Sequence, residues 1–172
     1  MRALSRLQRT RGLQTNFIVR KDFVGGAVRD GGLDAKTLQQ VRREYVGNML
    51  DSDYVLCARG AGNFSYRLYE TLSCGRIPVF VDTDCVLPYD FMIEWPEYGV
   101  WIDEAAVNDV GHSVLEFHER LNEREFEDLQ RECRRFWERY LRPEGFFENL
   151  HEHLNVVEPA RLEPHAPRPV NR

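Results

Sequence analysis

The chain has 172 residues, about the length of one domain, and its 42% hydrophobic and 30% charged residues are ordinary proportions for a globular protein. The formal net charge of -5 argues against a nucleic-acid partner bound mainly through a basic surface. No apolar run approaches the roughly 18 residues of a membrane span, and the N-terminus lacks the apolar core of a signal peptide.

The cysteines indicate a reducing compartment and no metal site. They form no C-x-x-C pair and have no histidine at zinc spacing, so we interpret them as buried or half-buried thiols. The four are Cys57, Cys74, Cys85 and Cys133. We therefore expect a cytoplasmic protein without a bound metal ion.

The first fifty residues are predicted to form a helix, a strand and a second helix. The arginine-rich start, up to about residue 14, has leucines at helical spacing, which favours an amphipathic helix over a targeting peptide. Residues 15–20 (TNFIVR) read as a short strand, and a glycine-rich loop follows. Asp34 is a plausible N-cap for a helix that runs to Met49.

The middle of the chain alternates between buried strands and helices. Residues 53–58 (DYVLCA) are apolar without alternation, as expected for a strand of a parallel sheet covered on both faces. A helix is predicted from Ser65 to Cys74, with Ser65 as N-cap and Gly75 at the C-cap position. The next predicted strand is residues 77–81.

The last third is predicted to be mainly helical after one more strand. Residues 87–95 are aromatic and irregular, and we interpret the arginine-rich run that starts at Arg131 as a solvated helix face. The remaining predicted elements are a strand at 99–102, helices at about 107–121 and 125–140, and a short helix at 146–154. Residues 158–172 are rich in proline and charge and predict a disordered tail. Residues 1–157 thus predict one α/β domain, a Rossmann-like, mainly parallel sheet flanked by helices.

The loop Arg59-Gly60-Ala61-Gly62 follows a predicted strand and precedes a predicted helix. Ligands of open α/β sheets bind at the carboxyl ends of the strands, so this loop is a candidate phosphate-binding site. Glycines allow the backbone to approach a phosphate, and arginine supplies a fork of donors. The alternative is a strand-to-helix turn that needs positive φ at its glycines.

Arg67 and Glu70 are three residues apart and therefore share one face of the predicted helix. Arg67 in the first turn would bind phosphate, and Glu70 would accept hydrogen bonds from ribose hydroxyls. The alternative is a surface ion pair. Asp82 and Asp84, which close a strand, are interpreted as turn formers rather than ligands.

The stretch as a whole is more specific than its parts, because it joins the segment SDYVLCARGAGNFSYRLYETLSCGRIPVFV to the motifs LPY and IEW. It closely resembles the exostosin-like glycosyltransferase family over about residues 49–103. The resemblance implies the C-terminal, nucleotide-sugar-binding lobe of a two-lobed GT-B glycosyltransferase. That family often has a proline at the position of Ala58, an acidic residue near Ala61 and a cysteine where Arg76 stands here.

By this resemblance, Arg59, Gly60 and Ser65 form a diphosphate loop that includes Gly62 and Tyr66. Arg67 neutralises the leaving diphosphate, and Glu70 holds the ribose. The donor would be a nucleoside-diphosphate sugar, UDP-sugar first, from which a hexosyl group passes with inversion to a glycan or other hydroxyl acceptor. No further cofactor is implied, and no residue is identified as the catalytic base. The alternative is a catalytically silent nucleotide-sugar-binding or scaffold module that pairs with another chain carrying the acceptor lobe.

Overall fold

The computed structural model describes residues 2–29, 32–60 and 62–155. The predicted tail at 158–172 lies outside these residues. No helix in the described part of the chain is long and apolar enough to cross a membrane.

A three-stranded parallel sheet with the order β3-β4-β5 forms the centre of the fold. The strands are β3 (Tyr54–Cys57), β4 (Ile77–Asp82) and β5 (Val100–Asp103). Tyr54 lies opposite Ile77, and Val79 lies opposite Val100. The predicted α/β class with a parallel sheet is confirmed, and the strands predicted at 53–58, 77–81 and 99–102 lie within one residue of the observed β3, β4 and β5.

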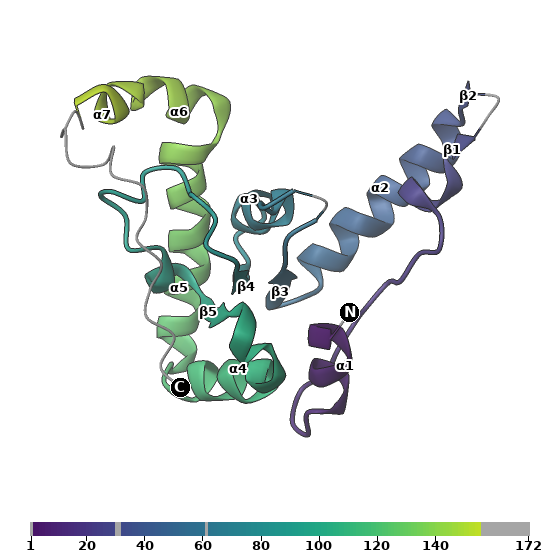
Figure 1. The fold of residues 1–172 in the computed structure, drawn as a ribbon, viewed down its shortest axis with the longest axis horizontal. Coiled ribbons are helices and arrows are strands. Elements are labelled where there is room, and N and C mark those ends of the chain that lie inside the picture. Colours follow the sequence, from purple (N-terminus) through teal and green to yellow (C-terminus); the bar gives the residue numbers. More distant parts are fainter. Residues whose placement is uncertain (1, 30–31, 61, 156–172) are drawn as a thin grey trace.

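Helices cover both faces of the sheet (Figure 1). On one face lie α3 (Tyr66–Ser73) and α5 (Glu123–Phe136), and on the other lie α1 (Arg2–Arg9) and α4 (Val110–Glu119). Neighbouring residues of each strand point to opposite faces. Toward α3 and α5 the buried core contains Val55, Cys57, Leu68, Leu72, Phe80, Cys133 and Phe136. Toward α1 and α4 it contains Ala3, Leu7, Val79, Val100, Ile102, Val110 and Val114.

Helix α2 (Ala35–Leu50) begins after Asp34, whose side chain accepts hydrogen bonds from the backbone N–H groups of Lys36 and Thr37. The predicted N-cap is therefore confirmed. In Figure 1 the helix projects away from the sheet and contacts the core through its last turns, where Met49 is buried.

The glycine-rich segment before α2 is more ordered than the predicted loop. It contains a 3₁₀ turn at Phe23–Gly26 and a short antiparallel ribbon of β1 (Val28–Arg29) and β2 (Gly32–Leu33). Figure 1 shows this ribbon at the far end of α2.

The predicted strand at residues 15–20 is wrong, because this segment joins neither sheet. The backbone carbonyl of Asn16 accepts a hydrogen bond from the Asn48 side chain of α2 at 2.8 Å. Phe17 packs under the sheet, whereas Ile18 and Val19 are exposed. A tertiary contact with a helix therefore replaces the ladder that the β-branched residues favour.

The remaining elements follow the prediction with shifted ends. The helix predicted from residue 107 begins as a 3₁₀ turn, Glu104–Asp109, before α4, and α5 continues into a π-helical turn, Trp137–Leu141. The predicted final helix is divided into α6 (Pro143–Glu148) and α7 (Leu150–Asn155). Another 3₁₀ turn, Trp95–Tyr98, precedes β5.

Gly75 and Gly99 occupy positions where a side chain would be strained or would collide with a neighbour. Gly75 has φ +62°, and the N–H groups of Gly75 and Arg76 donate to the carbonyls of Leu72 and Thr71, which closes α3 with a Schellman motif. Gly99 lies against Pro78, which occupies the start of the central strand, and a Cβ at residue 99 would lie 2.3 Å from the Pro78 carbonyl oxygen.

We expect Gly99→Ala to lower the free energy of unfolding by about 1–3 kcal/mol, because the added methyl group would displace the central strand. The matched control is Gly47→Ala in α2, where a Cβ would meet nothing within 4 Å. That change should raise the free energy by about 0.5–1 kcal/mol, since alanine favours a helix interior. Urea unfolding of both variants measures the difference, and equal effects would contradict the observed close approach at Gly99.

Candidate functional site

The loops that follow the three strands are linked at the carboxyl edge of the sheet. The Asn63 side chain donates to the Thr83 carbonyl at 3.1 Å, and the Thr83 hydroxyl donates to Asn63 Oδ1 at 2.5 Å. Arg59 Nη2 lies 3.5 Å from Glu104 Oε1, just beyond β5. The segment after β3 is therefore tied to the segments after both other strands.

The glycine loop is exposed at Arg59 and Gly60. Neither Gly60 nor Gly62 has positive φ, so the alternative explanation of these glycines as left-handed turn residues is not supported. A Cβ at Gly60 would meet nothing within 4 Å, whereas a Cβ at Gly62 would lie 2.6 Å from the Phe64 ring. Gly62 thus makes room for Phe64, and Gly60 leaves backbone accessible from outside.

Helix α3 starts at the same edge, with Ser65 as its N-cap residue. The Ser65 side chain is buried and makes no capping hydrogen bond. Tyr66 is 71% exposed, and its ring lies edge-on to that of Phe64 with the centroids 5.0 Å apart. The positive end of the helix dipole therefore faces the glycine loop, with the exposed side chain of Arg67 in the first turn.

Arg67 and Glu70 both contact Tyr45 of α2. The Tyr45 hydroxyl donates to Glu70 Oε2 at 2.5 Å, and the Arg67 guanidinium lies over the Tyr45 ring at 5.0 Å from its centroid. Arg67 and Glu70 thus meet through Tyr45, which differs from the surface ion pair that the sequence offered as the alternative. Burial, followed by the hydrogen bond to Glu70, raises the pKa of Tyr45 to about 12.

Sequence reasoning missed Tyr45 as part of the site. Helical spacing indicates which residues of α2 share a face, but it does not reveal which groups the Tyr45 hydroxyl reaches. The signal was the type of residue, because a half-buried tyrosine usually finds a partner for its hydroxyl.

Below the site, Cys57 and Thr71 are fully buried. The Thr71 hydroxyl donates to the Arg67 carbonyl at 2.6 Å, and the Cys57 thiol lies 3.4 Å from the Thr71 hydroxyl. Burial raises the pKa of Cys57 to about 12, so this thiol stays protonated and is no nucleophile at neutral pH.

Asp82 and Asp84 form a turn, as predicted. Asp82 Oδ1 accepts from the Asp84 backbone N–H at 3.0 Å, its Oδ2 accepts from Trp101 Nε1 at 3.2 Å, and Asp84 has φ +55°. Within the described ranges no group of three or more His, Cys, Asp or Glu residues could hold a metal ion.

The predicted site residues lie in one continuous segment from the end of β3 into α3, but their contacts point in two directions. Arg59 pairs toward β5 through Glu104, whereas Arg67 and Glu70 contact α2. Gly60, Gly62, Ser65 and Tyr66 lie between these contacts along the chain.

A family model for the exostosin GT47 domain matches residues 11–117, a longer stretch than the resemblance at 49–103. This match spans the sheet, α3 and the candidate site. The chain belongs to the exostosin GT47 family. The expected family is thereby confirmed.

Individual relatives show a likeness over part of the chain. The chain is 30% identical to Exostosin-2 of Bos taurus over 103 residues, covering 60% of this chain and 14% of the relative. It is 30% identical to Exostosin-1 of Drosophila melanogaster over 114 residues, covering 66% and 14%. A probable glucuronosyltransferase of Oryza sativa subsp. japonica is 41% identical over 63 residues, covering 37% and 14%. The matched part thus spans about one seventh of the length of each relative.

We expect Tyr45→Phe to reduce the loss of stability at alkaline pH. Because the pKa of Tyr45 in the folded protein, about 12, lies above its ordinary value of 10, this residue stabilises the fold fully below pH 10. That stabilisation is lost as the pH rises toward 12. Urea unfolding between pH 8 and 12 should therefore show a shallower decline for the variant. Tyr66→Phe, which removes an exposed hydroxyl, is the control, and an equal change in both variants would contradict the buried contact of Tyr45.

Cys57 and Cys133 are both buried, and burial raises the pKa of each to about 12. We expect neither thiol to react with an aromatic disulfide reagent at pH 8 until the protein unfolds, because the thiolate is the reactive form. Mass spectrometry of the labelled peptides identifies the modified cysteines. Rapid labelling of Cys57 in the folded protein would contradict the packing of α3 on β3.

Proposed function

We propose that this chain is the donor-binding lobe of a glycosyltransferase and that its ligand is a nucleoside-diphosphate sugar, with UDP as the first candidate nucleotide. The observation that carries the proposal is the exposed Arg59-Gly60 backbone beside the start of α3, with Arg67 in the first helical turn, in a chain of the GT47 family. The likeness to a relative named as a probable glucuronosyltransferase supports a sugar donor.

The diphosphate would lie at the carboxyl edge of the sheet. Backbone N–H groups at the start of α3, the helix dipole and the guanidinium groups of Arg59 and Arg67 all favour negative charge there. In an inverting transfer, an acceptor hydroxyl oxygen bonds to the anomeric carbon as the bond to the diphosphate oxygen breaks. Negative charge grows on the leaving diphosphate, so these groups stabilise the transition state more than the ground state.

Glu70 would bind the ribose and keep its hydrogen bond with the Tyr45 hydroxyl. Its Oε2 accepts from the Tyr45 hydroxyl, and a carboxylate has a second oxygen that can accept from a ribose hydroxyl. Tyr45 then acts as a positioning residue, because it fixes the carboxylate of Glu70 and supports the guanidinium of Arg67.

We assign no general base in this chain. Transfer needs a group that removes the acceptor proton, and we propose that this group and the acceptor site belong to a second lobe, in the same polypeptide or in a separate chain. In the alternative, a catalytically silent module, the chain also pairs with a second lobe, but it binds the donor without turnover.

Calorimetric titration with UDP, GDP and UDP-glucose tests the donor site. We expect saturable binding of one diphosphate, weakened about tenfold or more by Arg67→Ala, because a hydrogen bond to a charged group contributes about 1.5–3 kcal/mol. Arg124→Ala is the matched control, since this 91% exposed side chain of α5 lies outside the site. Absence of binding by a folded wild-type chain would overturn the proposal. If the donor binds, release of UDP from UDP-glucose indicates an active enzyme, whereas binding without release indicates a silent module.

A further inference from the structure

A surface cavity of about 650 Å³ lies between the C-terminal turn of α3 and helix α5. Its charged and amide side chains are Arg76, Glu127, Gln130, Arg131, Arg134 and Arg135. The five residues from α5 recur at helical spacing, so they form the face that α5 turns toward the end of α3. This arginine cavity lies at the amino-terminal edge of the sheet, since Arg76 directly precedes β4.

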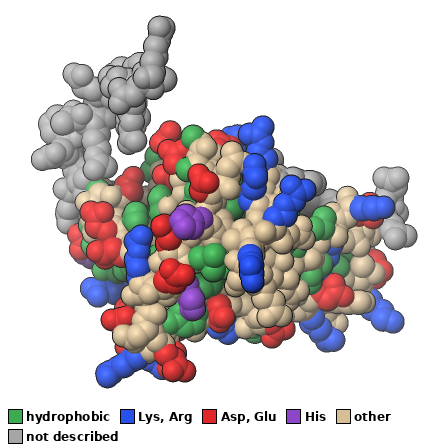
Figure 2. Space-filling model, turned by 90° about the horizontal axis from the view of Figure 1, so that it is seen from below, with side chains coloured by type: hydrophobic (Ala, Val, Ile, Leu, Met, Phe, Trp, Pro, Cys, Tyr) green, Lys and Arg blue, Asp and Glu red, His purple; other side chains and the backbone are tan. Residues whose placement is uncertain are grey.

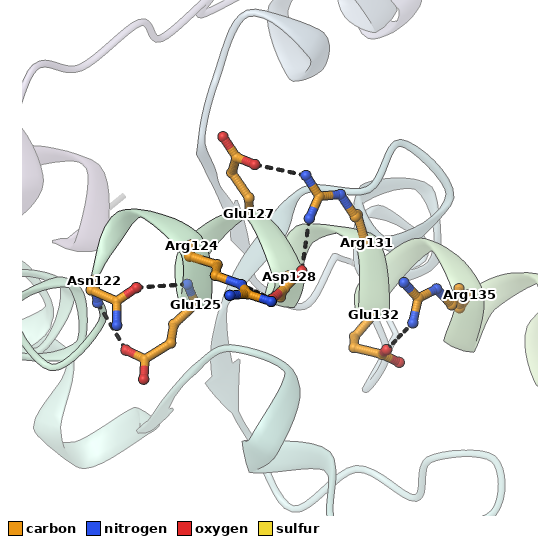
Figure 3. A network of polar contacts seen from close by, with 8 residues as sticks. All are labelled: Asn122, Arg124, Glu125, Glu127, Asp128, Arg131, Glu132 and Arg135. Carbon is orange, nitrogen blue, oxygen red and sulfur yellow. Dashed lines mark hydrogen bonds and ion pairs between the residues drawn. The ribbon is translucent and has the colours of Figure 1, made fainter.

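The arginines that α5 contributes to the cavity already have partners, of which Figure 3 shows those of Arg131 and Arg135. Arg131 donates to Glu127 and Asp128, both at 2.7 Å, and Arg135 pairs with Glu132. Arg134 pairs with Glu138 at 2.8 Å and donates to the Ser73 carbonyl at the end of α3. The side chains of these pairs are about half exposed, which agrees with the interpretation of this run as a solvated helix face. Ion pairs of this exposure contribute little stability.

Arg76 differs from them. Among the described residues it has no ion-pair partner, and its Nε atom is buried without a hydrogen-bond acceptor. The side-chain nitrogen of Gln130, from the same cavity lining, is also buried without an acceptor. Two unsatisfied donors beside one cavity are costly, because each buried group loses its hydrogen bonds to water.

Charges of both signs are interspersed over the face that Figure 2 shows. The arginine cavity has a different composition. Its four arginines and one glutamate instead concentrate donors in one place, and of these arginines only Arg76 lacks a carboxylate partner within the described part of the chain.

We propose that the arginine cavity binds a phosphate group, with Arg76 as the main ligand and Gln130 as a second donor. Both unsatisfied nitrogens are buried in this structure, so the side chains of Arg76 and Gln130 would turn toward the cavity when phosphate oxygens supply the missing acceptors. A dianion is favoured over a single carboxylate, because the ligand competes with the acidic partners of the neighbouring arginines. The cavity has the volume of a small-molecule site, so it leaves room for the organic part of a phosphate monoester.

This site is separate from the proposed donor site. Arg67 and the glycine loop lie at the start of α3 and the carboxyl edge of the sheet, whereas Gly75 and Arg76 follow the end of α3. The two sites can therefore be removed one at a time, and the phosphate site does not depend on the proposed transferase activity.

The test is calorimetric titration of the whole chain with inorganic phosphate, glucose 6-phosphate and glucose at constant ionic strength. We expect saturable binding of a phosphate compound and none of glucose. Arg76→Ala should raise Kd about tenfold or more, and Gln130→Ala should raise it less. Arg124→Ala, which removes an arginine of α5 outside the cavity, should change Kd less than about twofold. Arg76→Lys, which keeps the charge but loses the fork of donors, should fall between wild type and Arg76→Ala.

Saturation by inorganic phosphate would identify the free ion as sufficient, and binding of glucose 6-phosphate alone would identify a phosphate monoester. Absence of binding by both, or equal binding by wild type and a folded Arg76→Ala variant, would overturn the proposal. Loss of phosphate binding in Arg67→Ala would overturn it as well, because the phosphate would then occupy the donor loop. Retention in that variant, together with loss in Arg76→Ala, is the expected result.

Discussion

A parallel sheet of three strands must exclude water from both of its faces, and the other elements of this protein are placed by that requirement. Strands β3, β4 and β5 present apolar side chains in both directions, so one pair of helices has to cover each face. The strand ends lie at the two remaining edges of the sheet. The glycine loop, with Arg59 and Gly60 exposed, lies at the carboxyl edge, and the arginine cavity lies at the other.

Helix α3 connects these two edges. Leu68 and Leu72 fix it against the sheet, so its N-terminus is held beside the glycine loop and its C-terminus beside α5. The two ends have opposite partial charges. The start of α3 accordingly suits an anion directly. At its end Arg134 binds the Ser73 carbonyl, and Arg76 follows, for which the described residues offer no ion-pair partner.

Tyr45 gives the projecting helix α2 a role at the candidate site. Because its hydroxyl binds Glu70 and its ring supports Arg67, the position of α2 determines how these two side chains are presented. Donor binding and the placement of α2 are therefore coupled in our proposal. The coupling acts through one half-buried side chain, since few other residues of α2 pack against the core.

The sequence by itself determined the three strands of the parallel sheet, the main helices, the Asp34 and Gly75 caps and the glycine loop, because local patterning and turn chemistry encode them. Only the tertiary structure decided that residues 15–20 pack beside α2 without joining a sheet, that Tyr45 joins Arg67 to Glu70, and that Arg76 meets α5. Each of these depends on residues far apart in the chain. Helical and strand periodicity specify which face of an element turns inward. They do not specify which side chain of another element contacts that face.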